Sequence, residues 1–143
     1  PYSTDFSRNP QTYADIDPAQ QSYPPAVPRS PIIGNTADQV HNVGEVWCNT
    51  LLEGRAALWA IHGFAANELM MQLVVDGMKL GPAGPNFLEE RDAILQADLV
   101  NNGGANLAAL WSAFAKRGMG LSASSPSGGS STTGIVEAYD TPI

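Results

Sequence analysis

Residues 38–62 read DQVHNVGEVWCNTLLEGRAALWAIH, and this stretch decides the fold class. Its apolar residues recur at steps of three and four, which is the spacing of one face of an α-helix. They are Val40, Val43, Trp47, Leu51, Leu58 and Ile61. Thr36 or Asp38 can cap the start, and His62-Gly63 provides a stop because glycine readily takes the left-handed conformation that ends helices. The pattern therefore predicts one helix of roughly 25 residues.

Three further segments carry helical periodicity, and each is bounded by glycine, proline or a capping residue. Residues 69–80 form the second segment, which ends at a Gly-Pro pair. The third begins after Asn86, with Glu89 at the capping-box position, and the fourth spans 107–117. Because the connections are short, we expect a mainly α fold, a compact bundle of about four to five helices.

The two ends of the chain differ in composition from the middle. Seven of the eleven prolines fall within residues 1–35, which predicts an extended, irregular N-terminal segment that packs on the bundle; a disordered leader is the alternative. The bundle itself is expected over 36–121. Residues 122–143 form a Ser/Gly-rich loop and a C-terminal tail, in which 135–139 could be a short edge strand or a docked tail.

Composition excludes several classes of partner. Seven Lys and Arg against fourteen Asp and Glu give a net charge of −7, so a polyphosphate such as nucleic acid would be repelled. No apolar run approaches the roughly 20 residues of a membrane-spanning helix, so no membrane partner is expected. Hydrophobic residues make up 43% of the chain and charged residues 15%, which excludes a disordered acidic tail.

Metal-binding residue types are scarce, since the sequence holds one cysteine, Cys48, and two histidines, His41 and His62. A structural zinc site takes four Cys or His ligands, and a catalytic site takes three protein ligands. If the protein does metal chemistry, we therefore expect most of the ligands to come from outside this chain.

His41 is the strongest candidate for a functional side chain. It lies in the first turn of the longest predicted helix, one position off the apolar stripe, with Glu45 and Cys48 four and seven residues further along the same line. The alternative is a boundary histidine that is hydrogen-bonded to its neighbour. Cys48 has no basic neighbour and is expected to be a half-buried, inert thiol. His62 is expected to cap the end of its helix.

Five sequence blocks occur in an order and at a spacing that resemble the fungalysin family of secreted zinc metallopeptidases, which belongs to the thermolysin-like group. They are PYSTD at 1–5, VHNVGEVW at 40–47, LVVDGMKL at 73–80, RDAILQAD at 91–98 and FAKRGMG at 114–120. The resemblance covers nearly the whole chain and implies the C-terminal helical domain of such an enzyme. The HExxH histidines and glutamate and the third zinc ligand of the family would lie upstream of Pro1.

The resemblance also implies roles for residues and partners. His41 would stabilise the oxyanion of the tetrahedral intermediate, and Asp38 would be a possible orienter of its ring. The cofactor would be zinc, held by ligands outside this chain, and the partners would be the upstream zinc-binding half and protein or peptide substrates. The complete enzyme would be an extracellular endopeptidase, and this chain alone would be inactive. The competing interpretation is a stand-alone, non-catalytic helical module that binds a protein or peptide.

Overall fold

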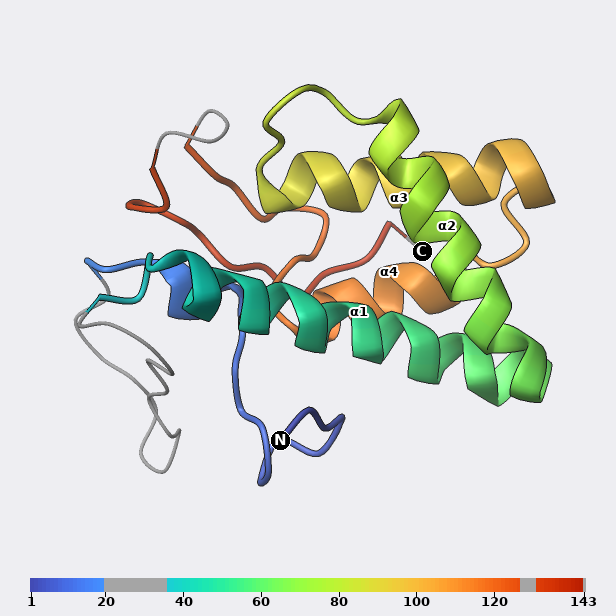
Figure 1. Ribbon diagram of the computed structural model, residues 1–143, viewed down its shortest axis with the longest axis horizontal. Coiled ribbons are helices and arrows are strands. Elements are labelled where there is room, and N and C mark those ends of the chain that lie inside the picture. The colour runs from blue at the N-terminus through green and yellow to red at the C-terminus, as the bar shows by residue number, and fades with distance from the viewer. Residues whose placement is uncertain (20–35, 127–130, 143) are drawn as a thin grey trace.

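The computed structural model describes residues 1–19, 36–126 and 131–142 and shows a mainly helical domain (Figure 1). Its α-helices are α1 (Val40–His62), α2 (Ala66–Leu80), α3 (Phe87–Asn102) and α4 (Leu107–Lys116). Two short 3-10 turns, η1 (Tyr13–Ile16) and η2 (Gly63–Ala65), complete the elements. The mainly α prediction is confirmed. Within the described ranges, no helix is both long enough and apolar enough to cross a membrane.

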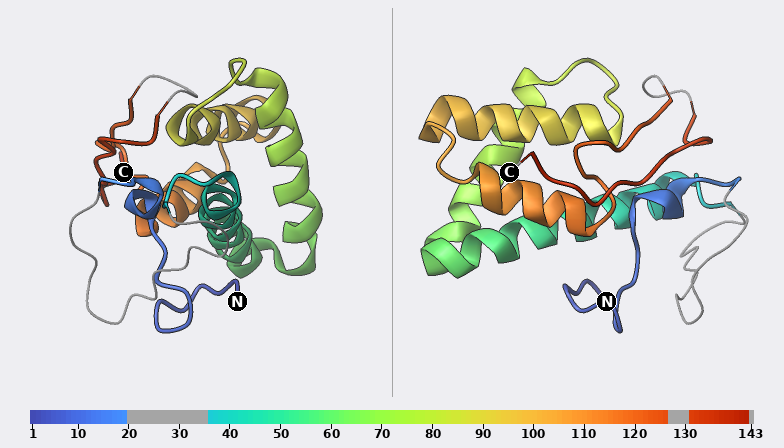
Figure 2. Two further views of the ribbon diagram at one scale, coloured as in Figure 1. Left: turned by 60° about the vertical axis from the view of Figure 1, so that its left-hand side comes forward. Right: turned by 180° about the vertical axis from the view of Figure 1, so that it is seen from behind.

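The helices enclose a single core. α1 runs along one side and α3 along the other, α4 lies between them, and α2 connects the two sides at one end (Figures 1 and 2). The closest approach is between α2 and α3. A Cβ on Gly77 of α2 would lie 2.8 Å from Cγ1 and 3.2 Å from Cα of Ile94 in α3, so glycine is required for this separation. Leu58, Leu73, Ile94, Leu110 and Phe114 are fully buried in the core.

The buried face of α1 coincides only in part with the predicted apolar stripe, of which Leu58 is fully buried. Val40 is 73% exposed and Ile61 is 59% exposed, while Val43, Trp47 and Leu51 are partly buried against the core. The fully buried positions are largely polar or small: Asn42, Val46, Asn49, Thr50, Glu53, Gly54 and Leu58. The stripe was partly misplaced because polar side chains on α1 bond to segments that are distant in the sequence, which a periodicity of apolar residues cannot reveal.

The predicted ends of the helices are partly right. The capping box of α3 is confirmed, since Glu89 N–H donates to Asn86 Oδ1 and Asn86 N–H donates to Glu89 Oε2, both at 2.9 Å. The cap of α1 is Gln39 rather than Thr36 or Asp38. Gly63 ends α1 with φ 59° and ψ −135°, outside the left-handed helical region, and the chain turns directly into η2.

A buried arginine holds the N-terminal segment to the bundle. Arg117, at the end of α4, is 0% exposed and donates to Glu53 Oε1 from Nε at 2.8 Å and from Nη2 at 2.5 Å. Its remaining hydrogen bonds go to the backbone carbonyls of Ser3, Asn9 and Gln11, at 2.6–2.9 Å. Residues 1–19 thus lie against α1 and α4. Residues 20–35, the remainder of the predicted extended segment, lie outside the described residues.

The C-terminal segment is a docked tail with two isolated bridges, Met119 to Ala138 and Ser124 to Val136. It passes so close to Gly120 that a Cβ there would lie 2.6 Å from the carbonyl oxygens of Ala138 and Asp140. Of the predicted 122–143 loop and tail, residues 127–130 and 143 are outside the described part of the chain.

Candidate functional site

His41 occupies the second position of α1, and its side chain is exposed. Its backbone N–H donates to Oε1 of the cap residue Gln39 at 2.7 Å, which fixes the main chain at the start of the helix. Within the described residues, the imidazole makes no hydrogen bond and no ion pair. The ring is therefore carried on a capped helix turn, and no described residue bonds to either of its nitrogens.

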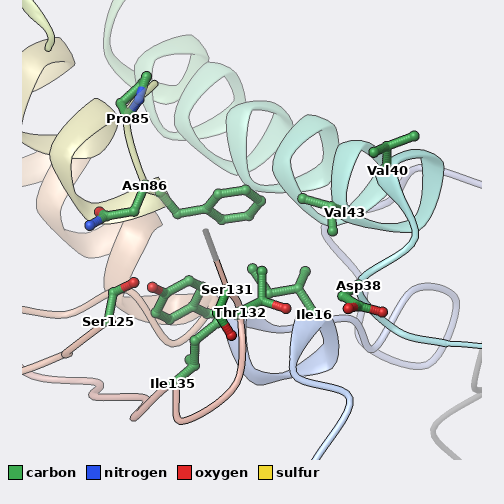
Figure 3. A pocket seen from close by; sticks show the side chains of 12 residues that line it. Ile16, Asp38, Val40, Val43, Pro85, Asn86, Ser125, Ser131, Thr132 and Ile135 are labelled. Carbon is green, nitrogen blue, oxygen red and sulfur yellow. The ribbon is translucent and has the colours of Figure 1, made fainter. Parts of the chain in front are cut away.

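Asp38 lies just before the cap of α1 and is also exposed. Among the residues that the structure describes, no hydrogen bond joins its carboxylate to the His41 ring. The carboxylate instead lines a pocket beside the first turn of α1 (Figure 3). The two predicted site residues are thus close in sequence, but the structure does not bond them to one another.

The face of α1 that carries His41 is bordered by the beginning of the chain. The Tyr2 hydroxyl donates to Glu45 Oε1 at 2.9 Å, and Ser3 N–H donates to Asn49 Oδ1 at 3.1 Å. Hydrogen bonding to Glu45, with a smaller contribution from Cys48, raises the pKa of Tyr2 to about 12, so the hydroxyl stays protonated.

Cys48 and His62 are the other two residues of types that commonly bind metals. Cys48 is exposed rather than half-buried, because it lies on the outer face of α1. His62 Nε2 lies 2.6 Å from Asn106 Oδ1, and the Asn106 amide donates to the fully buried Asp98 at 2.7 Å. Because the amide is oriented by Asp98, its oxygen faces His62, which must donate. His62 therefore fastens the end of α1 to the start of α4.

The described residues do not themselves form a metal site, since no three of their His, Cys, Asp and Glu side chains are grouped so that they could hold an ion. His41, His62 and Cys48 are spread along α1, and of the three side chains His62 is hydrogen-bonded, to Asn106. Zinc does not fit any donor set of this part of the chain.

A cavity of about 310 Å³ lies between the first turns of α1, η1, the start of α3 and the C-terminal tail (Figure 3). We call it the η1 pocket. Its lining consists of Tyr13, Ile16, Asp38, Val40, Val43, Pro85, Asn86, Phe87, Ser125, Ser131, Thr132 and Ile135. The sequence did not predict this pocket, because its walls come from four separate segments of the chain.

Among the residues that the structure describes, two hydroxyl groups of the η1 pocket are buried without a hydrogen-bond partner, Tyr13 Oη and Thr132 Oγ1. Burial raises the pKa of Tyr13, and Ser125 and Arg91 offset part of that effect. The Ser125 hydroxyl nevertheless donates to the Pro126 carbonyl at 2.9 Å and does not complete a hydrogen bond with Tyr13. Buried polar groups in folded proteins are almost always bonded, so an unpaired hydroxyl in a cavity wall requires a reason.

Comparison with known protein families gives the class of protein: the family model described as Fungalysin metallopeptidase (M36) matches residues 1–123 of this chain. The chain therefore belongs to the fungalysin metallopeptidase family, which confirms the resemblance found in the sequence.

Individual relatives agree with this assignment. An extracellular metalloproteinase of Pyricularia oryzae is 41% identical over 138 residues, and one of Aspergillus niger is 39% identical over 140 residues; both matches cover 86% of this chain and 19% of the relative. Extracellular metalloproteinase 2 of Trichophyton rubrum is 37% identical over 137 residues, covering 84% of this chain and 18% of that protein. The chain thus spans about a fifth of the length of the curated relatives that it matches.

Proposed function

We propose that this chain is the C-terminal helical domain of a secreted zinc endopeptidase, where it forms one wall of the active-site cleft. The observation that carries the proposal is the placement of His41 in the block VHNVGEVW: its ring is exposed on the first turn of α1 and is unbonded within the described residues. The names of the relatives support secretion, because they are described as extracellular metalloproteinases.

In this role the His41 imidazole donates a hydrogen bond to the oxygen of the substrate carbonyl as that oxygen becomes negative. Attack of water on a peptide carbonyl produces a tetrahedral intermediate, whose oxyanion needs a donor that is already in position. A ring held on the first turn of a helix meets this need with little reorganisation, and it can donate in its neutral or its charged form. In this proposal, zinc bound by the upstream part of the polypeptide supplies Lewis-acid chemistry.

Asp38 is the weaker part of the proposal. A carboxylate that accepts a hydrogen bond from one ring nitrogen fixes the orientation of the other, so Asp38 could orient His41 once substrate or the upstream half is present. Its carboxylate is exposed and can turn toward the ring, but in this structure it lines the η1 pocket. Exchange of Asp38 for Asn should therefore reduce turnover less than removal of His41.

The test is the replacement His41→Ala in the complete enzyme. We expect kcat to fall by about 10²–10³, which is the usual cost of losing one oxyanion donor, with zinc content unchanged. His62→Ala is the matched control, because His62 is the other histidine and its ring bonds only to Asn106 among the described residues. Turnover of His41→Ala close to that of the unmodified enzyme would overturn the proposal.

The isolated chain provides a second test. Because it contains no metal site in its described residues, it should not cleave casein or a quenched peptide in the presence of zinc. Turnover that a chelator abolishes would show that the zinc ligands had been assigned to the wrong part of the protein.

A further inference from the structure

The η1 pocket is built to receive an apolar group. Ile16, Val43 and Ile135 supply aliphatic walls, and the rings of Tyr13 and Phe87 stack with their centroids 5.7 Å apart. Phe87 is held in turn by Trp47 of α1, at a centroid distance of 5.0 Å. The cavity of about 310 Å³ is at the lower end of the range for ligand sites, which suits a side chain better than a large cofactor.

The polar groups of the η1 pocket indicate what accompanies that apolar group. Tyr13 is 1% exposed, yet its hydroxyl has no hydrogen-bond partner among the described residues, and the buried hydroxyl of the half-buried Thr132 has none among them either. A buried hydroxyl without a partner destabilises the folded chain. A bound peptide offers what these hydroxyls lack, since each of its residues carries a carbonyl acceptor and an N–H donor.

The charge at the η1 pocket favours a base. Asp38 is the one charged residue among the described residues that line it, and the chain as a whole has a net charge of −7. A carboxylate at the edge of an apolar pocket attracts a Lys or Arg that neighbours the inserted side chain and repels an acidic one.

The pocket also lies beside the proposed reaction centre. Asp38 and Val40 line it and flank His41 in the sequence, at the start of α1 (Figure 3). The pocket therefore borders the helix turn that carries His41. We propose that the η1 pocket is a subsite for a peptide substrate and binds an apolar side chain next to a basic residue. This inference rests on the proposed peptidase function for its choice of ligand.

Binding is measured without catalysis, by calorimetry or nuclear magnetic resonance titration. The proteins are the 143-residue chain and the complete polypeptide with its metal removed by a chelator. The probes are the dipeptide amides acetyl-Phe-Lys, acetyl-Ala-Lys and acetyl-Phe-Glu. We expect acetyl-Phe-Lys to bind about tenfold more tightly than acetyl-Ala-Lys, because the Ala peptide has no aromatic side chain to bury in the pocket. Acetyl-Phe-Lys should also bind more tightly than acetyl-Phe-Glu, because Asp38 attracts Lys and repels Glu.

Variants locate the binding. Val43→Asp should abolish it, and Tyr13→Phe should weaken it severalfold, because a hydrogen bond to the peptide is lost. Val75→Asp is the control, because Val75 lies on the outer surface of α2, is 43% exposed and does not line the pocket. Equal affinity for the Phe and Ala peptides, or unchanged binding by Val43→Asp, would overturn the inference.

Comparing the two proteins shows whether a peptide substrate or the upstream half of the polypeptide occupies the η1 pocket. If the peptide binds the 143-residue chain but not the complete polypeptide, the upstream half fills the pocket in the complete polypeptide. The subsite assignment would then be wrong. Failure of the peptidase proposal is recognised separately. His41→Ala would then leave turnover unchanged, while the side-chain selectivity of the η1 pocket, measured without metal, would persist.

Discussion

Two neighbouring regions hold the N-terminal segment against the bundle, and they treat buried polar groups in opposite ways. Around Arg117, which is 0% exposed, the guanidinium bonds to Glu53 and to three backbone carbonyls. Tyr13 N–H donates to the Arg117 carbonyl at 2.8 Å, but the hydroxyl of the same tyrosine is buried without a partner. Complete bonding marks the Arg117 cluster as structural, whereas the unpaired hydroxyls of the η1 pocket suit a group from outside the chain.

The largest effect on the free energy of unfolding is expected from removal of the Arg117 charge. Arg117→Met leaves Glu53, which is 4% exposed, as a buried carboxylate whose remaining cation is Lys116 at 2.9 Å. The free energy of unfolding should fall by about 3–5 kcal/mol in urea denaturation, because a buried charge loses its main partner. Lys79→Met is the control, since its ion pair with Asp76 lies at the surface and should contribute less than about 1 kcal/mol. A loss below that of the control would show that the cluster is not structural.

A smaller effect is expected where the C-terminal tail reaches the pocket. Gly120→Val places a side chain against the carbonyl oxygens of Ala138 and Asp140, which should displace the tail and cost about 1–3 kcal/mol. Thermal unfolding measures the loss, and binding of acetyl-Phe-Lys should fall with it because Ile135 and Thr132 of the tail line the pocket.

Gly44→Ala is the matched control for that prediction. Gly44 lies within α1, and a Cβ there would meet nothing within 4 Å. The exchange should raise the free energy of unfolding by about 0.5–1 kcal/mol through helix propensity alone. Equal destabilisation by both variants would contradict the proposed close packing of the tail.

Tyr13→Phe tests the contrast between the two regions directly. Removal of an unpaired buried hydroxyl should raise the free energy of unfolding by about 1 kcal/mol, whereas loss of a bonded one would lower it. Chemical denaturation of the 143-residue chain gives the sign. Destabilisation would show that the hydroxyl is bonded in solution and would remove one support for the peptide subsite.

The smallest expected effect is a dependence of stability on pH at η1. Burial, with a contribution from the charge of Glu137, raises the pKa of Asp15 to about 6. The folded chain therefore takes up a proton more readily than the unfolded chain, and the free energy of unfolding should rise as pH falls from 7 to 4.5. Asp15→Asn should remove this dependence in urea denaturation at a series of pH values. A profile that is unchanged by Asp15→Asn would assign the effect to another group.

Local sequence signals predicted a large part of the fold. The helical periods, the Asn86–Glu89 capping box and the Gly-Pro end of α2 depend on contacts within a few residues, and the structure has them. His41 was placed at the first turn of α1 for the same reason. The buried face of α1 was predicted only in part and the exposure of Cys48 wrongly, because both depend on which distant segments lie against the helix.

The sequence by itself determined the helices, the family and the position of His41 within its block, since each of these is encoded by residues near one another in the chain. Only the tertiary structure decided that Arg117 joins α4 to the carbonyls of Ser3, Asn9 and Gln11, and that η1, α1, α3 and the tail enclose one pocket. The physical reason is that these contacts join residues up to 123 positions apart. Their formation depends on how whole elements pack, which no local pattern of residues records.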